Sequence, residues 1–450
     1  MLNHDIEISL LLALFIMTLL GAGSSLIVGI VGVMLCVVGA IQQPAAVDLR
    51  ILLPLIFYNA ISMAASYAAG ESIVEGYVSM QAILPVIYLL LACLDDGGRI
   101  LLRRLCVLWA GAAAAAGILR FTGLAMYSGA GRLGWPLGNP NALGCLLVLG
   151  WFALLNCCEE LPEPQGRRPG WGRLPQLEPV LLMALALTLS MESFLAMAAG
   201  ILVLLIERKR RGSWRDTALC ACRVLAKAAL GIGSGVLLFL AADRTRCPWL
   251  CLPVLVCGVW AAACWRSFGR FLEVYPWMAA LLSGAGVLVA GAAVVMRPSS
   301  IATFLERLEM MRDGLGYLTE RPLLGVGPYH WRLLNLYSGE KYFNTWFIHN
   351  SLIHIGVELG LIAAAAVLLV LLRFCRKRKT AEERGMLAAF FAHNMLDVTF
   401  FVPSISAMLL LSISEPRQGG KQLGSGLRRI LFGVYFVHFL RTVCHFVIRF

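Results

Sequence analysis

Ionisable residues gather around one long apolar run of the sequence, in the segment 321–361. Three of the chain's seven histidines fall there, namely His330, His349 and His354. The ordinary pKa of a histidine side chain, about 6.5, lets it exchange a proton near neutral pH. His349 stands directly before the apolar run, where its ring would lie at the boundary between water and apolar surroundings. This position predicts a base for a hydroxyl group or a cation that holds a phosphate, with His330 and His354 as rivals.

Polar residues continue into apolar segments at a spacing of four, which places them on one face of a helix. The residues at this spacing are Asn350, His354 and Glu358, and on a later segment His393 and Asp397. Glu358 lies roughly 13 Å along a helix from His349. A charge at such depth in a membrane costs at least roughly 2.5 kcal/mol. We therefore expect Glu358 to be neutral, paired or facing a polar site, and Asp397 to orient basic residues. The alternative is a buried hydrogen-bond network that joins two helices.

Arginines occur between the long apolar runs of the sequence. Their guanidinium groups bind phosphate oxygens in pairs and keep their protons. The candidates for such contacts are Arg120, Arg132, Arg307, Arg312, Arg321 and Arg332. Arg307 and Arg312 are five residues apart, so at most one should point straight at a site. The alternative for Arg132 and Arg307 is contact with lipid headgroups.

The segment Asn139-Pro140-Asn141 predicts a helix N-terminus. Asparagine suits the cap position and proline suits the first helical position. Capping is compatible with a second role for these side chains, in binding a substrate.

These residues belong to a chain that is too apolar for a soluble domain. Of its 450 residues, 59% are hydrophobic and 14% are charged. Apolar runs of about 17–25 residues recur, long enough to cross about 30 Å of hydrocarbon. We predict an all-α, polytopic bundle of about 12–14 transmembrane helices. The expected spans are 6–20, 24–41, 51–69, 77–94, 99–118, 141–158, 177–190, 192–206, 218–241, 247–264, 276–296, 350–373, 385–402 and 404–414.

Basic residues predict the orientation of the bundle. The strongly basic loops are 99–104, 167–173, 208–215 and 373–384. A cytoplasmic N-terminus places all of them in the cytoplasm, as the positive-inside rule expects. The net charge of +12 is then a topology signal. We expect no nucleic-acid partner, because the basic residues sit in short loops without interleaved exposed aromatic residues.

The C-terminus is also expected in the cytoplasm. The segment 427–450 is predicted to lie in the plane of the inner leaflet as a basic amphipathic helix. A further span is the alternative, although it would bury Arg441.

Three segments then face outward, 119–140, 189–193 and 297–350. A loop of about fifty residues on one face is usually functional. Within it, apolar residues at helical spacing predict an amphipathic helix over 302–318. These residues are Phe304, Leu308, Met311, Leu315 and Leu318.

We expect no metal or cofactor, because no CxxC pair or Cys/His zinc spacing occurs.

Four motifs resemble those of the O-antigen ligase and O-antigen polymerase superfamily. They are RLGWPLGNPNALG at 132–144, ERLEMMRDGLGYLTERPLLGVGPYHW at 306–331, HNSLIHIGVELGLIA at 349–363 and HNMLDVTFF at 393–401. Their order and spacing agree over 119–414. The chain departs from the family at the second outer corner, where Met191 follows Ser190 in place of the arginine of many members.

The resemblance implies a C-type glycosyltransferase that works without a metal at the outer face of the plasma membrane. It would move a glycan from a polyprenyl diphosphate carrier to an acceptor hydroxyl, as a ligase or as a polymerase. The implied catalytic residues are His349 and Asp397. The implied contacts to the diphosphate or glycan are Arg132, Arg307, Arg321, Asn139, Asn141, Asn350 and Glu358. The implied organisation is transmembrane helices at 1–118, a catalytic domain at 119–414 with its outer loop at 297–350, and a basic tail at 415–450.

A secondary transporter or lipid-linked sugar flippase is the main alternative. It would share the many spans and the intramembrane carboxylates, but it would usually show internal repeats and Gly/Pro-broken helices in corresponding halves. No such repeat is evident, and polar residues concentrate on one outer face. A non-catalytic assembly protein would not need His349 together with the arginines.

Overall fold

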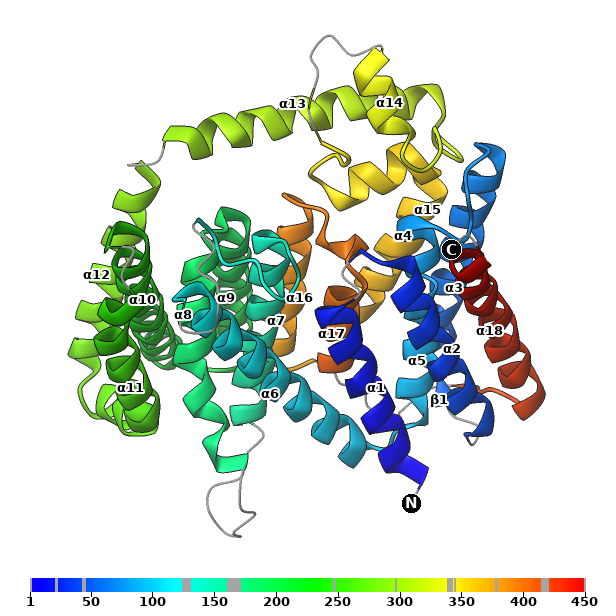
Figure 1. Cartoon of the computed structure of the whole chain (residues 1–450). Helices are drawn as coiled ribbons and strands as arrows, with labels where there is room; N and C mark the ends of the chain where they lie inside the picture. The colour runs from blue at the N-terminus through cyan, green and yellow to red at the C-terminus, as the bar shows by residue number, and fades with distance from the viewer. Residues whose placement is uncertain are drawn as a thin grey trace. The chain divides into compact units, whose positions relative to one another are not determined.

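A computed structural model describes the chain except residues 1, 21–22, 43–45, 124–130, 160–170, 246–247, 296–297, 338–342, 344, 377–378, 414–420 and 449–450. Parts of the expected outer segments 119–140 and 297–350, and most of the basic loop 167–173, therefore lie outside the described residues. The described residues are almost all helical (Figure 1). They form two compact units, unit 1 with 1–103, 303–378 and 393–450, and unit 2 with 104–302 and 379–392. These units do not follow the segments 1–118, 119–414 and 415–450.

Unit 1 combines helices from both ends of the chain with the segment 303–378. Its elements are α1 (Leu2–Leu19), α2 (Ser25–Ile41), β1 (Ala46–Val47), α3 (Leu49–Ala68), α4 (Gly76–Met80), α5 (Ile83–Cys93), the start of α6 (Asp96–Phe121), most of α13 (Pro298–Glu320), α14 (His330–Tyr337), α15 (Ser351–Arg376), the 3-10 helix η2 (Thr399–Phe401), α17 (Pro403–Ser412), β2 (Lys421–Gln422) and α18 (Ser425–Ile448). The two short strands pair antiparallel. α15 packs along α3, and α18 packs along α2.

Unit 2 is a bundle of the middle helices. Its elements are the rest of α6, α7 (Pro140–Glu159), the 3-10 helix η1 (Trp171–Leu177), α8 (Glu178–Thr188), α9 (Met191–Arg211), α10 (Trp214–Thr245), α11 (Pro248–Val274), α12 (Pro276–Val295) and most of α16 (Ala381–Asn394). α8 packs against α7 and α10, and α10 also packs against α12.

A buried carboxylate that the sequence analysis did not single out organises unit 2. Glu178, the first residue of α8, is 3% exposed. It accepts hydrogen bonds from the indole N–H groups of Trp151 at 3.2 Å and Trp265 at 2.7 Å. Its other partner is the ammonium group of Lys227, at 3.1 Å. Since these residues belong to α7, α11 and α10, one carboxylate ties three helices to α8.

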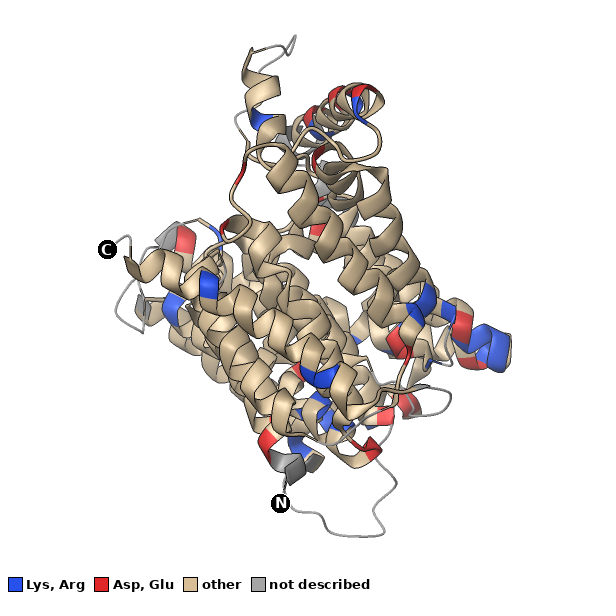
Figure 2. Cartoon of the chain, turned by 90° about the vertical axis from the view of Figure 1, so that its right-hand side faces the viewer, with Lys and Arg blue, Asp and Glu red and all other residues tan. Residues whose placement is uncertain are grey.

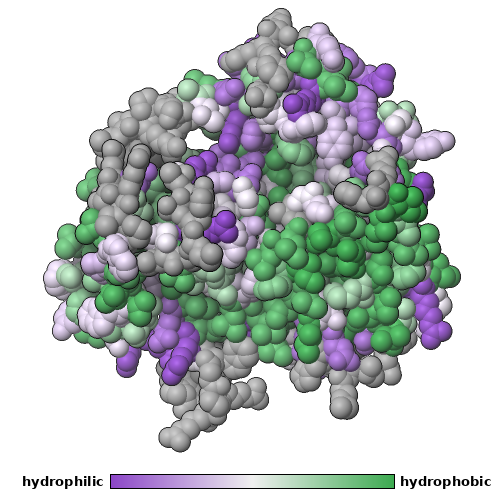
Figure 3. Space-filling view, viewed as in Figure 1, coloured by the Kyte–Doolittle hydropathy of each residue, from purple (hydrophilic) through white to green (hydrophobic). Residues whose placement is uncertain are grey.

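The helices have the length and composition of membrane spans. Within the described residues, eight helical segments are long and apolar enough to cross a membrane. They are Leu49–Ala68, Gly76–Cys93, Asp96–Phe121, Pro140–Glu159, Trp214–Asp243, Trp249–Val274, Ser351–Arg376 and Ser425–Ile448. Long stretches of helix carry no charged residue (Figure 2), and hydrophobic side chains cover the face of unit 1 near α1 and α2 (Figure 3). The all-α prediction is confirmed, and the architecture fits a multi-pass membrane protein.

Basic residues collect at one end of the helices of unit 2. Arg208, in the last turn of α9, pairs with Glu159 at the end of α7 and with Glu382, 2.7 Å away, in the first turn of α16. Asn139 and Ser190 belong to the expected outer segments, and they directly precede the first residues of α7 and α9. Arg208 therefore lies at the C-terminal end of α9, beside that of α7, and the expected outer residues lie at the N-terminal ends of both helices.

The span expected over 385–402 is wrong in its second half. α16 ends at Asn394, and Asp397 lies in the turn before η2, so His393 and Asp397 do not share a helical face. The physical reason is local. The side-chain oxygen of Asn394 accepts the backbone N–H of Phe400 at 2.6 Å, which offers the backbone an alternative to helical hydrogen bonds.

The helix expected over 302–318 is present as part of α13, and its apolar residues are not all buried. Phe304 and Leu308 are 43% and 44% exposed, whereas Arg307 and Met310 are 8% and 5% exposed. On a helix beside a membrane, apolar side chains can face lipid. Apolar periodicity therefore does not identify the side that faces the protein.

The C-terminal segment forms the helix α18 within unit 1. α18 packs lengthwise against α2, so close that a side chain at Gly39 would meet the ring of Phe432 and one at Gly32 would meet the ring of Phe439. Its length and apolar composition suit a membrane span. The segment thus belongs to the bundle of unit 1, which matches the alternative of a further span.

Candidate functional site

The first turn of α15 is tied to the turn that follows α16. Asn350 caps α15, since its side-chain oxygen accepts the N–H of Ile353 at 3.0 Å. Its side-chain nitrogen donates to the carbonyl of Met395 at 3.2 Å. Asparagine suits both roles because it accepts and donates at once. The cap therefore brings His349, the residue before it, to the turn that contains Asp397.

His349 and Asp397 face each other across this junction. The Nδ1 atom of His349 lies 3.3 Å from the Oδ1 atom of Asp397. A carboxylate beside Nδ1 orients the imidazole and favours a proton on that nitrogen, which leaves Nε2 as the acceptor. No described residue bonds to Nε2, and the His349 side chain is 24% exposed. The pair can therefore present Nε2 of His349 as a base to a molecule that approaches from the solvent.

Asp397 is held in its charged form. Burial acts to raise the pKa of this carboxyl group, but the hydrogen bond and charge of His349, followed by the charge of His393 and the N–H of Val398, bring the pKa well below its ordinary value. Asp397 therefore stays an anion throughout the neutral and mildly acidic range. It serves as the orienting partner of His349 rather than as a base that titrates near neutrality.

Arg307 reaches the same turn from α13. Its Nη1 atom donates to the carbonyl of Leu396 at 2.7 Å, next to Asp397. Arg312 is exposed, which agrees with the expectation that at most one of the two arginines points at a site. His349, Asn350, Asp397 and Arg307 therefore form one cluster, hereafter the His349 cluster.

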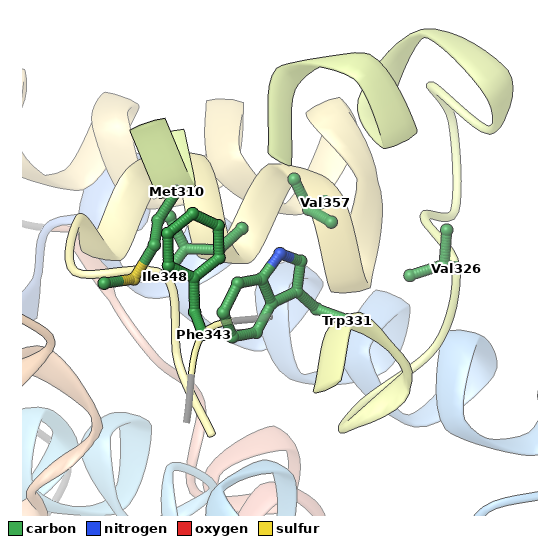
Figure 4. Close-up of a cluster of buried hydrophobic side chains, with 6 residues drawn as sticks. All are labelled: Met310, Val326, Trp331, Phe343, Ile348 and Val357. Carbon is green, nitrogen blue, oxygen red and sulfur yellow. The ribbon is translucent and has the colours of Figure 1, made fainter. Parts of the chain in front are cut away.

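A hydrophobic core beside the first half of α15 supports this cluster. It consists of Met310, Val326, Trp331, Phe343, Ile348 and Val357 (Figure 4). The indole of Trp331, 0% exposed, lies beside the ring of Phe343 in this view. The side-chain amide of Asn335 in α14 holds Phe343 by donating to its carbonyl at 2.8 Å. The core thus fastens α13, α14 and Ile348 to α15, and Ile348 directly precedes His349.

α15 is broken at Gly360, and the outer loop fills the break. Gly360 has φ +87° and ψ 166°, outside the helical region. The N–H groups of Val326 and Gly327 donate to the carbonyls of Val357 at 2.8 Å and Glu358 at 3.0 Å. The loop backbone therefore satisfies carbonyl groups that the interrupted helix leaves free.

Gly360→Ala is expected to destabilise the protein. A Cβ at this residue would lie 1.9 Å from the carbonyl oxygen of Leu323, so the loop backbone must move. The backbone conformation alone costs an alanine about 1–3 kcal/mol. Gly316→Ala in α13 is the matched control, because its Cβ meets nothing within 4 Å. Thermal unfolding of the purified protein should show a lower midpoint for the Gly360 variant alone. Equal midpoints for the two variants would contradict this account.

Unit 2 holds a second group of expected site residues. Arg132 donates from Nε to the carbonyl of Thr188 at 2.8 Å and from Nη2 to the side-chain oxygen of Asn141 at 2.6 Å. Asn139 accepts the N–H of Asn141 at 2.8 Å, as the predicted cap at the start of α7. The segments 132–141 and 188–190 therefore meet.

The second expected outer corner completes this group. Ser190 caps α9 by accepting the N–H of Ser193 at 3.3 Å, and its hydroxyl donates to Glu192 at 3.0 Å. A side chain at Gly144 would lie 2.2 Å from the hydroxyl of Ser193, so α7 passes close to this corner. The family-like motif and the corner that carries Met191 thus belong to one structured end of unit 2.

Other expected site residues lie apart from the His349 cluster. Arg321 is exposed and directly follows the last residue of α13, whereas Arg307 lies in the middle of that helix. Glu358 is 0% exposed and accepts a hydrogen bond from Tyr77 at 2.6 Å, so it reaches no solvent. The rival histidine His330 lies beside the carbonyl of Pro328, at 3.2 Å.

Sequence reasoning missed several residues that support the cluster. Ser351 donates to the side-chain oxygen of Asn394 at 2.8 Å and to the carbonyl of Asp397 at 3.1 Å. The order Asn394 and Asp397 after an apolar helix is a signal for a turn, and it could have indicated where α16 ends. No local signal indicates Tyr77, which meets Glu358 across 281 positions of sequence.

Comparison with the models of known protein families finds none that matches the chain, and comparison with curated proteins finds no match either. The resemblance to O-antigen ligases and polymerases rests on the four motifs quoted above.

Proposed function

We propose that the protein is a membrane glycosyltransferase of the O-antigen ligase and polymerase type. It moves a glycan from a polyprenyl diphosphate carrier in the bilayer to an acceptor hydroxyl on the outer face of the plasma membrane. The observation that carries the proposal is the His349 cluster, in which an imidazole with an orienting carboxylate and an arginine meet at the start of a helix of membrane length.

The chemistry follows from these groups. The acceptor oxygen attacks the anomeric carbon of the donor sugar, the bond from that carbon to the diphosphate breaks, and polyprenyl diphosphate leaves. Nε2 of His349 takes the hydroxyl proton as the new glycosidic bond forms, oriented by Asp397. Negative charge grows on the departing diphosphate, and the guanidinium group of Arg307 stabilises that charge. No step in this scheme needs a metal ion.

The second group, Arg132, Asn139 and Asn141, lies in unit 2, and its role as a contact to the glycan or the acceptor rests on the family-like motif at 132–144. Their side chains are exposed or half-buried at one end of unit 2. Arg321 is free to meet the charged headgroups of lipids or the diphosphate, because it is exposed.

The proposal is tested by analysing the lipid-linked glycan that accumulates in a strain from which the gene has been deleted. Mass spectrometry should find the carrier with its glycan still attached, and the purified protein in vesicles should release polyprenyl diphosphate when donor and acceptor are both present. Long accumulated chains indicate a ligase, and single repeats indicate a polymerase. No accumulation, together with no release in vesicles, would exclude both.

One observation favours the transporter alternative. The helix α15 is interrupted at Gly360 beside the buried Glu358, an arrangement that transporters use at their binding sites. A flippase would move the labelled lipid-linked glycan across a vesicle membrane without forming a glycosidic bond. The vesicle experiment therefore separates the two functions by product analysis.

A further inference from the structure

A buried group of three polar side chains lies beside the His349 cluster, within unit 1. The hydroxyl of Tyr77 in α4 donates to Oε2 of Glu358 at 2.6 Å. Nε2 of His354 lies 3.3 Å from the same oxygen. Tyr77 is 2% exposed, and His354 and Glu358 are both 0% exposed. We call this the Glu358 group. Tyr77 and His354 therefore both approach the same oxygen of Glu358, Tyr77 through a hydrogen bond and His354 as a close ion-pair contact.

The Glu358 group contacts two residues that precede α15 in the sequence. Nδ1 of His354 accepts the backbone N–H of Ile348 at 3.4 Å. The backbone N–H of Tyr77 donates to the hydroxyl of Tyr329 at 2.9 Å. A side chain at Gly76 would overlap that hydroxyl, at 1.6 Å, so the close approach depends on glycine.

The same group touches the segments that carry both members of the His349–Asp397 pair. The ring of Phe347, two residues before His349, lies 5.1 Å from the ring of His354 between centroids. Phe401, four residues after Asp397, lies 4.6 Å from the ring of Tyr77. Movement of the Glu358 group would therefore move the backbone on either side of the pair.

We propose that Glu358, His354 and Tyr77 are positioning residues that hold His349 against Asp397. The proposal rests on the proposed function for its catalytic consequence, but the geometric link stands on the contacts alone. The second oxygen of Glu358 has no partner among the described residues. The carboxyl group therefore acts through Oε2, and an uncharged side chain that keeps an oxygen there should serve as well.

The test compares two buried tyrosines of the same unit. Tyr77→Phe removes the hydrogen bond to Glu358. Tyr58→Phe removes a hydrogen bond to Gln81 from a side chain that is likewise 2% exposed. Hydrogen exchange of the full-length protein in lipid nanodiscs reports on backbone amides in 345–350. We expect about tenfold faster exchange there in the Tyr77 variant, and none of this change in the Tyr58 variant.

Transfer kinetics supply the second readout. Tyr77→Phe should lower kcat by about ten- to a hundredfold, because a misplaced base costs that much, while KM for the donor stays within about twofold. Glu358→Gln keeps an oxygen for the phenol and should stay near wild type in exchange and kcat, whereas Glu358→Leu should match Tyr77→Phe.

Unchanged exchange at 345–350 in Tyr77→Phe would overturn the proposal. Faster exchange throughout unit 1 would also overturn it, because it would show a general structural role. Local acceleration in a protein whose wild type transfers no glycan would support the positioning role and reject the proposed function. The two claims therefore fail separately.

Discussion

Replacing His349 by alanine is expected to lower the rate of glycan transfer by roughly 10²- to 10⁴-fold, the usual contribution of a general base. The reason is geometric. His349 has Asp397 on one side of its ring and an exposed edge on the other, so the carboxylate holds the ring while the side chain stays accessible. Transfer of a labelled glycan in reconstituted vesicles measures the change, once membrane levels of the variant have been matched to wild type.

His330→Ala is the matched control for this experiment. His330 also belongs to the outer loop, and its side chain is 29% exposed against 24% for His349. It stands beside Glu71 at 4.0 Å and not beside Asp397. We expect near-normal transfer from the His330 variant. The assignment is wrong if His349→Ala transfers normally, or if His330→Ala loses as much activity as His349→Ala.

The pH profile separates two roles for His349. A base is lost as the pH falls, because protonation occupies Nε2, whereas a cation that clamps the diphosphate is lost as the pH rises. Asp397 does not obscure this result, because the charge of His349 and its hydrogen bond outweigh burial and hold the pKa of the carboxyl well below its ordinary value. Asp397 thus stays charged across the range in which a histidine titrates.

Much of the helical architecture could be predicted because apolar runs of about twenty residues have few stable alternatives in a membrane. The expected span at 350–373 corresponds to α15, Ser351–Arg376. The same reasoning failed where side chains replace helical hydrogen bonds. At the end of α16, Asn394 and Asp397 capture backbone N–H groups at 2.6 Å and 2.8 Å, and hydropathy does not register such bonds.

Part of the candidate site could be predicted from the sequence, and part could not. The sequence predicts that Asp397 orients basic residues of a site, and Asp397 lies 3.3 Å from His349 within unit 1. The partner of Glu358 was not anticipated, because Tyr77 lies 281 positions away in the sequence. Helical spacing indicates which residues share a face, but it does not indicate what that face meets.

The expected effect of Arg307→Lys is a loss of transfer, even though the charge is kept. The guanidinium group holds the carbonyl of Leu396 at 2.7 Å through one nitrogen. A planar guanidinium group can bind this carbonyl and a phosphate oxygen in fixed geometry, whereas an ammonium group on a flexible stem cannot reproduce both contacts. A charge-assisted hydrogen bond is worth about 1.5–3 kcal/mol, so transfer should fall by roughly ten- to a hundredfold.

Arg312→Lys, five residues later on α13, is the control, because Arg312 is exposed and should tolerate the change. The kinetic pattern then identifies what Arg307 does. A contact that forms with the departing diphosphate lowers kcat and kcat/KM together, whereas a contact to the bound donor alone raises KM. If Arg307→Ala, at normal membrane levels, transfers glycan like wild type, then Arg307 only braces the turn at Leu396. The leaving group must in that case be held elsewhere, and Arg132, whose fork binds Thr188 and Asn141, becomes the residue to replace next.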